Sequence, residues 1–289
     1  MILFLLFGLI VPVANAHHYY GHGHCYRGGY YSSGSIYLIR SDYREDKSTF
    51  GDCDEYYLIT KTTTNYYSNG SRRTYSSYNI INSKNSSVLI ADCSFVQHFL
   101  EGGNHYFIVK QGSFYQIIDE LGNVLTNREY KLVKRLGENR FLVKLNKLYG
   151  VINLQDEIVV PIKYKKFDEI GRGLFITNLN SYYGITSFDN VTLVRNEYDK
   201  ISRMHEVYLL KYKGEYGLCD VFGRIILPAD NDSIKKLGEY IVVKKDKKYS
   251  VYDQFGKQIG EESYRKVKLE RNTLKVMPNG ADWQELSTL

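Results

Sequence analysis

Histidine is concentrated near the start of the chain, where residues 17–26 read HHYYGHGHCY. Imidazole nitrogens bind Cu(II), Ni(II) and Zn(II), and a histidine-rich tract is a compositional signal for metal binding. The spacing differs from that of a structural zinc site. A soluble leader that binds Cu, Ni or Zn adventitiously is therefore the favoured interpretation, and no other cofactor is expected. The candidate metal ligands are His17, His18, His22 and His24.

Lysine is concentrated towards the other end of the chain. Residues 235–268 hold ten Lys or Arg against five acidic residues, with tyrosines interleaved. Such a face could bind a polyanion or an anionic surface, and the alternative is that these lysines are solvated and protect strand edges. The candidate binding lysines are Lys244, Lys245, Lys247 and Lys248.

Motifs of the common catalytic classes do not occur in the sequence. There is no GxSxG, HExxH, P-loop or paired CxxC, each of which has a spacing that its chemistry requires. The carboxylates are scattered, and Asp220 and Asp253 stand at turn positions where a structural role suffices. We therefore expect no catalytic residues and no enzymatic activity, with a propeller enzyme as the least favoured alternative.

The first sixteen residues, MILFLLFGLIVPVANA, are apolar and end in small residues. This pattern predicts a signal peptide over residues 1–16, and the run is too short to span a bilayer. An uncleaved anchor is the alternative. A flexible leader rich in His, Gly and Tyr is expected over residues 17–35. The mature chain is then secreted, or resides in the periplasm or cell envelope, without a membrane span.

Export makes a disulfide bond feasible. The chain has four cysteines, of which Cys53 and Cys93 lie outside its regular part. These two are the preferred candidate pair, but sequence cannot choose between the connectivities. Unpaired buried thiols are the other interpretation.

The elements that position these side chains follow from an internal repeat. Five times, an apolar triplet closed by a polar residue is followed five residues later by a tyrosine, and these tyrosines are 34, 34, 33 and 33 residues apart. Seven residues after each tyrosine comes Gly, Asp or Asn, which tolerate a left-handed backbone and so predict a turn. The repeated tyrosines, also candidate binding residues, are Tyr115, Tyr149, Tyr183, Tyr216 and Tyr249, and fifteen residues after them stand Tyr130, Tyr164, Tyr198, Asn231 and Tyr264.

Each unit therefore reads as a short strand, a tight turn, an aromatic strand, a second turn and a strand rich in Val and Ile. No 3.6-residue period is long enough for a helix, so the strands should form antiparallel meanders. The predicted fold class is all-β, with tandem antiparallel β-meander repeats of 33–34 residues. A closed β-propeller-like ring is preferred over an open β-solenoid, because closure protects edge strands.

The repeats predict a single β-repeat domain over residues 36–289. Residues 36–105 read as diverged units with a polar insertion, and residues 106–270 hold the five regular repeats. Residues 271–289 read as a terminal strand and tail. Atypical ends are expected of a repeat array, because terminal units cap it.

The repeated pattern is clearest in KLYGVINLQDEIVVPIKYKKF and KGEYGLCDVFGRIILP. It resembles the WG repeat, a bacterial β-repeat family, with Tyr-Gly in place of Trp-Gly, over about residues 106–270. The resemblance implies a structural repeat that mediates binding, and it carries over no catalytic residue.

The repeated tyrosine is interpreted first as a packing residue, and the glycine after it as a site of close backbone approach. A column of exposed aromatics that stack on a ligand is the alternative. On the packing interpretation, Tyr149→Ala should cost on the order of 3 kcal/mol.

These observations predict an exported repeat protein that acts as a binding or scaffold module. The predicted partner is another protein, through protein–protein interaction, or a cell-envelope polymer. A secreted metal- or carbohydrate-binding protein is the alternative. The net charge of +6 is spread among acidic residues, so no nucleic acid is expected as a partner.

Overall fold

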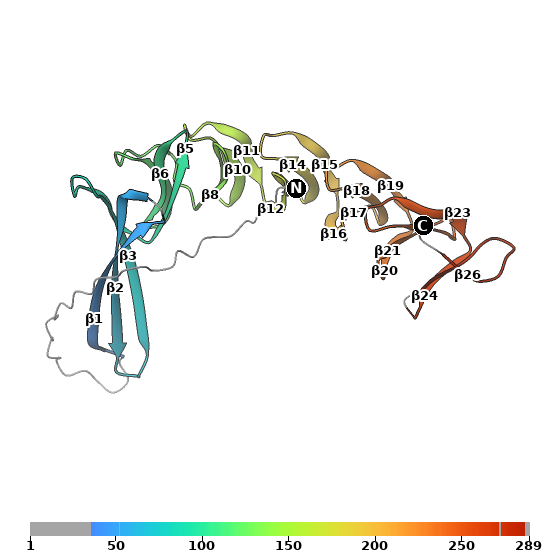
Figure 1. The fold of residues 1–289 in the computed structure, drawn as a ribbon, viewed down its shortest axis with the longest axis horizontal. Helices are drawn as coiled ribbons and strands as arrows, with labels where there is room; N and C mark the ends of the chain where they lie inside the picture. Colours follow the sequence, from blue (N-terminus) through green and yellow to red (C-terminus); the bar gives the residue numbers. More distant parts are fainter. Residues whose placement is uncertain (1–35, 52, 272, 287–289) are drawn as a thin grey trace. The chain divides into compact units, whose positions relative to one another are not determined.

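The computed structural model describes residues 36–51, 53–271 and 273–286. The chain divides into two compact units. Unit 1 comprises Met1–Lys134 with Leu154–Asp156, and unit 2 comprises Arg135–Asn153 with Glu157–Leu289. The described residues form strands and turns without a helix, which confirms the predicted all-β class (Figure 1). Accordingly, no helix long and apolar enough to cross a membrane occurs among them.

Unit 1 contains two antiparallel sheets. The first has the order β1-β2-β3-β4 and the second the order β5-β6-β7. Their strands are β1 (Leu38–Phe50), β2 (Cys53–Tyr67), β3 (Arg72–Asn82), β4 (Val88–Cys93), β5 (Phe95–Glu101), β6 (Asn104–Gln111) and β7 (Phe114–Asp119).

Unit 2 contains the other five sheets, apart from the first residues of β8. Four of these sheets have four strands and the last has three, and neighbours pair in chain order as antiparallel meanders. The strands are β8 (Leu132–Gly137), β9 (Arg140–Leu145), β10 (Leu148–Ile152), β11 (Ile158–Tyr164), β12 (Lys166–Gly171), β13 (Leu174–Leu179), β14 (Tyr182–Ser187), β15 (Thr192–Tyr198), β16 (Lys200–Met204), β17 (Val207–Tyr212), β18 (Glu215–Asp220), β19 (Ile225–Asn231), β20 (Ser233–Leu237), β21 (Tyr240–Lys245), β22 (Lys248–Tyr252), β23 (Gln258–Tyr264), β24 (Lys266–Glu270), β25 (Thr273–Met277) and β26 (Gln284–Glu285).

The predicted turn positions have the backbone that their residue types indicated. All five residues seven places after the repeated tyrosines have positive φ: Gly122, Asp156, Asn190, Gly223 and Gly256. Four of the five two-residue turns that precede the tyrosines, such as Asn146–Lys147 and Asp246–Lys247, have positive φ at both positions. This is the type I′ geometry that matches the twist of a β-hairpin.

The glycine after the repeated tyrosine lies beneath a bulge in the next strand. Tyr149 pairs with Tyr164 but Val151 pairs with Val160, so β11 has two more residues than β10 over the same interval. A Cβ atom on Gly150 would lie 2.6 Å from the carbonyl oxygen of Val160. The same register shift recurs after Tyr183 and Tyr216, where the following glycines meet backbone atoms equally closely. At these three positions the close backbone approach therefore requires glycine, whereas Gln116 and Ser250 follow the other two repeated tyrosines.

The diverged region contains a further copy of this arrangement. Tyr78 pairs with Cys93, fifteen residues later, and a register shift follows before Ile80 pairs with Ile90. The next residue is Asn79 rather than glycine, and its Oδ1 accepts the backbone N–H of Asp92 at 2.9 Å. The first sheet is thus built on the same repeat, with Tyr78 in the tyrosine position and Cys93 in the position of Tyr164.

The polar stretch at residues 62–79 forms strands joined by a turn. It was predicted as an insertion, but its residues prolong β2 and β3, which pair continuously from Tyr56↔Asn82 to Tyr66↔Arg72. The first strand, β1, starts at Leu38 and pairs along β2 as the outer strand of the first sheet. Thr and Ser side chains bond across this ribbon, for example Thr64 to Thr74 at 3.1 Å.

The hydrophobic core lies between successive sheets within each unit. In unit 2, Ile185 and Val194 of one sheet pack with Tyr208 and Leu210 of the next. Further clusters join the later pairs of sheets in the same way, and unit 1 has a cluster between its own two sheets. Each sheet buries its faces only because a neighbour covers it, as in other repeat proteins.

The close approach at Gly150 generates a test of the fold. We expect Gly150→Ala to destabilise the protein by about 1 to 3 kcal/mol, because the added methyl group must displace backbone. Gly137→Ala is the matched control, since a Cβ atom there would meet nothing within 4 Å. Denaturant unfolding of both variants measures the difference. Equal stability of the two variants would contradict the close approach.

Candidate functional site

The repeated tyrosines lie half-buried beside the two-residue hairpin turns. In unit 2, Tyr149 stands directly opposite Lys144 on one side and Tyr164 on the other. The Lys144 Nζ lies 4.8 Å from the centre of the Tyr149 ring, within the range of a cation–π contact. Lys211 and Tyr216 repeat this pair, and Lys244 stands opposite Tyr249. In unit 1 the same pair is Lys110 and Tyr115.

These tyrosines seal the cores between sheets. Tyr183, Tyr216 and Tyr249 each pack, partly buried, on the cluster that joins their own sheet to the next. The residues fifteen places later are generally deeper, since Tyr164 is 4 % exposed and Tyr264 is 1 % exposed. The repeated tyrosine is therefore a packing residue that keeps part of its ring in contact with solvent.

We call the end of unit 2 that carries these turns the hairpin edge. It comprises the two-residue turns at 146–147, 180–181, 213–214 and 246–247, with the repeated tyrosines and the lysines beside them. Lys245, Lys247 and Lys248 are exposed on the β21–β22 hairpin, and Lys244 is half-buried. Lys245 pairs with Asp230 at 2.6 Å, and such exposed ion pairs stabilise a fold by less than about 1 kcal/mol. These charges are therefore accessible to a partner.

Two shallow depressions lie along the hairpin edge. One, of about 240 Å³, is lined by residues that include Tyr182, Tyr212 and Lys213, and another, of about 160 Å³, by residues that include Lys211 and Tyr216. Both are open and are smaller than the roughly 300 to 1,000 Å³ of usual small-molecule pockets. They suit side chains of a larger partner better than an enclosed substrate.

The carboxylates of the repeated turns have structural roles. The Oδ1 atom of Asp220 accepts the backbone N–H groups of Phe222 and Arg224 at 2.8 and 2.9 Å. Asp253 does the same with Phe255 and Lys257. These bonds to the charged form, together with Arg224, lower the pKa of Asp220 despite its partial burial. The turn carboxylates are engaged in holding the backbone, as their sequence position indicated.

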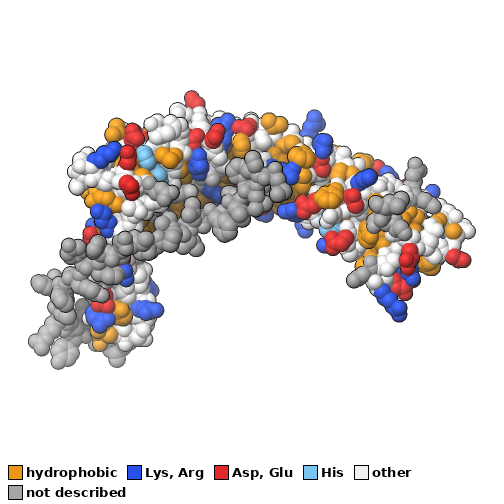
Figure 2. Space-filling model, viewed as in Figure 1, with side chains coloured by type: hydrophobic (Ala, Val, Ile, Leu, Met, Phe, Trp, Pro, Cys, Tyr) orange, Lys and Arg blue, Asp and Glu red, His pale blue; other side chains and the backbone are white. Residues whose placement is uncertain are grey.

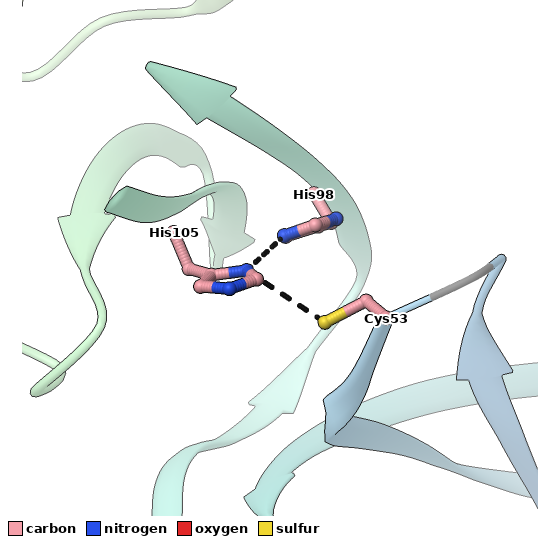
Figure 3. Close-up of side chains that lie close together, drawn as sticks. All are labelled: Cys53, His98 and His105. Atoms are coloured by element: carbon pink, nitrogen blue, oxygen red, sulfur yellow. Dashed lines mark hydrogen bonds between the residues drawn. The ribbon is translucent and has the colours of Figure 1, made fainter. Parts of the chain in front are cut away.

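A second candidate site lies in unit 1, where Cys53, His98 and His105 converge (Figure 3). Cys53 begins β2, while His98 of β5 and His105 of β6 lie diagonally across the hairpin that turns at Gly102 and Gly103. All three side chains are half-buried. This cluster was not predicted, because Cys53 is far from the histidines along the chain. The Gly-Gly turn could have revealed the histidine pair.

The donor atoms of this cluster face one another. The His98 Nε2 is 2.8 Å from the His105 Nδ1, and the Cys53 Sγ is 3.6 Å from that same Nδ1. Figure 3 shows the His105 ring facing both of the other side chains, with a dashed line to each. Burial, with a smaller effect of His105, lowers the pKa of His98 to about 4. The His98 imidazole is therefore neutral near pH 7.

The cysteines differ from the disulfide that the sequence favoured. Cys53 and Cys93 are both free thiols, and so is Cys219. Cys53 is beside His105, whereas Cys93 occupies the buried repeat position opposite Tyr78. Burial raises the pKa of Cys93 to about 11 and that of Cys219 to about 12, so neither is a reactive thiol. His17, His18, His22, His24 and the predicted signal peptide lie outside the described residues.

Comparison with known families decides the nature of the repeat. Residues 149–183 match the model of the WG containing repeat. This segment is therefore similar to the WG containing repeat. The match begins at Tyr149 and ends at Tyr183, so it spans one period of the repeat and confirms the predicted resemblance. The tyrosine-glycine pair at 149–150 opens the matched segment.

Other comparisons are distant. Kluyveromyces lactis Hsv2p has 11% sequence identity and a TM-score of 0.31, with coverage of 86% of this chain and 97% of that one. The Neurospora crassa Pan2 WD40 domain has 10% identity and a TM-score of 0.25, with coverage of 83% and 88%. We draw no inference from likenesses at this level. No curated protein matches the chain.

The burial of Tyr149 and Tyr164 generates a test. We expect Tyr164→Ala to cost about 3 to 5 kcal/mol, as for a large ring removed from a core. Tyr149→Ala should cost less, about 1 to 2 kcal/mol, because its ring is only half-buried. Denaturant unfolding midpoints measure both. A larger loss of stability for Tyr149→Ala than for Tyr164→Ala would contradict our interpretation that Tyr164 is the more deeply packed ring.

Proposed function

We propose that this chain is an exported binding or scaffold module whose partner is another protein. The observation that carries the proposal is the hairpin edge of unit 2, where three of the four half-buried tyrosines stand opposite a lysine. Tyrosine is enriched at protein interfaces because a rigid ring offers contact area and a hydroxyl offers a hydrogen bond. The open depressions support contact with an extended surface rather than catalysis.

The chemistry of this edge favours an acidic partner. Lys213, Lys245, Lys247 and Lys248 are exposed near the turns, and charges on the rim of an interface steer a complementary partner and select against the wrong one. Basic and acidic side chains are interspersed over the visible face of the molecule (Figure 2). The β21–β22 hairpin carries Lys244, Lys245, Lys247 and Lys248 around a single acid, Asp246, and so short a basic group supports an acidic protein segment over nucleic acid. An anionic cell-envelope polymer is the alternative partner.

Export belongs to the same proposal. The sequence of residues 1–16 supports secretion or residence in the periplasm or cell envelope. Mass spectrometry of the mature chain from its native host should find His17 as the first residue. An intact Met1 in the envelope fraction would favour an uncleaved anchor, and an intact Met1 in the cytosol would refute export.

Binding through the β21–β22 hairpin has a direct test. We expect the triple substitution Lys245→Glu, Lys247→Glu and Lys248→Glu to weaken binding of labelled poly-L-glutamate at least tenfold in fluorescence anisotropy, because each reversal replaces attraction by repulsion. The control triple, Lys235→Glu, Lys236→Glu and Lys257→Glu, reverses three exposed lysines, two on β20 and one in the turn before β23. Both triples lower the formal net charge from +6 to 0, since each reversal removes two charges.

Three outcomes of that experiment are distinguishable. Loss of binding in the hairpin triple alone supports the proposal. Equal loss in both triples means that net charge rather than the hairpin edge attracts the acidic chain, and this contradicts the proposed site. Binding of a glycerol-phosphate polymer in preference to poly-L-glutamate would favour an envelope polymer as the partner.

We also propose that the sheets close like the blades of a propeller. The seven sheets of three or four antiparallel strands support this, because propellers have four to eight blades of up to four strands. A compact chain of this length has a radius of gyration of about 19 Å. We expect small-angle X-ray scattering of the monomer to give a value near that figure. A clearly larger radius would contradict closure and favour an open β-solenoid.

A further inference from the structure

The cluster of Cys53, His98 and His105 is a separate feature from the hairpin edge, since it lies in unit 1. We propose that these three residues bind one zinc ion. The site is also distinct from the histidine tract at residues 17–24, because its ligands come from β2, β5 and β6 of the folded unit. Its failure would leave the proposed binding function of the hairpin edge untouched.

The distances fit the coordination of zinc. The three donor atoms all lie within 4.8 Å of one another, with a shortest separation of 2.8 Å between the His98 Nε2 and the His105 Nδ1. Zinc bonds of about 2.0 to 2.3 Å in a tetrahedron place neighbouring donors about 3.3 to 3.6 Å apart. The Cys53 Sγ already lies 3.6 Å from the His105 Nδ1. The two imidazoles therefore need to separate by only about half an ångström.

Aromatic side chains hold the histidine rings in place. The His98 ring centre lies 5.5 Å from that of Phe50 and 5.2 Å from that of Phe107. The ring of Tyr56 lies 5.2 Å from His105. These aromatic rings pack against the imidazoles and limit their rotation. Ligands that are preorganised in this way lose little entropy when they bind an ion.

Glu55 supplies the outer partner that a zinc-binding histidine usually has. Its Oε2 lies 3.6 Å from the His105 Nε2, the ring nitrogen that faces away from the cluster. Lys84 holds the other carboxylate oxygen at 3.0 Å. A shift of about half an ångström would let this carboxylate accept a hydrogen bond from the His105 Nε2–H, and that bond would fix the tautomer in which Nδ1 faces the metal.

The set of donors selects the kind of ion. One thiolate and two imidazoles suit zinc or copper, whereas magnesium and calcium require oxygen ligands. Three protein ligands leave a fourth position for water or a bound group, as in zinc sites that are not purely structural. Zinc is the choice here because the same donors satisfy its tetrahedral preference without an axial thioether.

A base-activated thiol would need a different arrangement. The order Cys53, His105 and Glu55 superficially suits a nucleophile, its base and an orienting carboxylate. However, the His105 Nδ1 lies closer to the His98 Nε2, at 2.8 Å, than to the Cys53 Sγ, at 3.6 Å. That nitrogen is already engaged with His98. A metal ion uses all three donors at once, whereas proton transfer would leave His98 without a role.

The test uses Co²⁺ as a spectroscopic substitute for zinc in the full chain. The background variant carries asparagine at His17, His18, His22 and His24, which removes the N-terminal tract. We expect one Co²⁺ per chain, with the absorption of a tetrahedral site and a sulfur-to-metal charge-transfer band, and we expect Zn²⁺ to displace it. In this background Cys53→Ser should abolish the charge-transfer band.

Substitutions around the cluster separate ligands from neighbours. His98→Asn should weaken Zn²⁺ binding at least about tenfold through loss of a ligand, and Glu55→Gln should weaken it about tenfold, as for other outer partners of metal-binding histidines. His205→Asn is the matched control, because His205 is a half-buried histidine in unit 2, remote from the cluster in sequence. It should leave affinity unchanged.

Two results would overturn the proposal. One is a background variant that binds neither Co²⁺ nor Zn²⁺, and the other is a Cys53→Ser variant that retains the full spectrum and affinity. If Cys53→Ser fails to fold, alkylation of the unsubstituted chain by iodoacetamide keeps the question open to test. Zinc should slow the alkylation of Cys53, and peptide mass spectrometry measures the rate of that alkylation. An equal rate with and without zinc would refute the site.

Discussion

A close approach of two backbones at the tyrosine-glycine step is the constraint on which the rest of the structure depends. The bulged strand passes over Gly150 so closely that a methyl group there would meet the carbonyl oxygen of Val160 at 2.6 Å. Tyr149 pairs with Tyr164 and Val151 pairs with Val160. The bulge accommodates the two extra residues of β11 between these two pairs. The same step recurs after Tyr183 and Tyr216, and it places a half-buried tyrosine at the same end of successive sheets.

The half-buried tyrosines lie where successive sheets join. In unit 2 the half-buried tyrosines cover the ends of the clusters between sheets, and lysines stand across the strand from three of them. At the other end of each sheet, carboxylates such as Asp220 hold the turn through two backbone N–H groups. Most of the recurring side chains, such as the tyrosines and the turn carboxylates, therefore have structural roles. The lysines of the hairpins are the groups left to contact a partner.

Much of this fold could be predicted from the sequence because the repeat has a nearly constant period. The tyrosine spacing gave the strand order, and Gly, Asp or Asn at the seventh position gave turns with positive φ. The relative depth of the two rings was not predictable, since Tyr149 and Tyr164 are the same residue type in similar surroundings of sequence. Burial depends instead on the bulge, which the sequence indicates only through Gly150.

The diverged part of the chain was harder to interpret. Tyr78 stands 37 residues before Tyr115, and Cys93 replaces the expected tyrosine, so the first copy breaks both the period and the residue type. Thr-rich residues that read as a loop form long strands, because cross-strand hydrogen bonds between hydroxyls stabilise them. The Cys53 cluster could not be predicted from spacing, because its members meet only when β2 approaches the β5–β6 hairpin.

The central claim is that the repeats form a scaffold that binds through its hairpin edge. Hydrogen–deuterium exchange of the full chain, with and without poly-L-glutamate, tests this most directly. The account predicts slower exchange confined to the segments around the turns at 146–147, 180–181, 213–214 and 246–247. Protection confined to the opposite turns, around Asp220 and Asp253, or no protection at all, would contradict it.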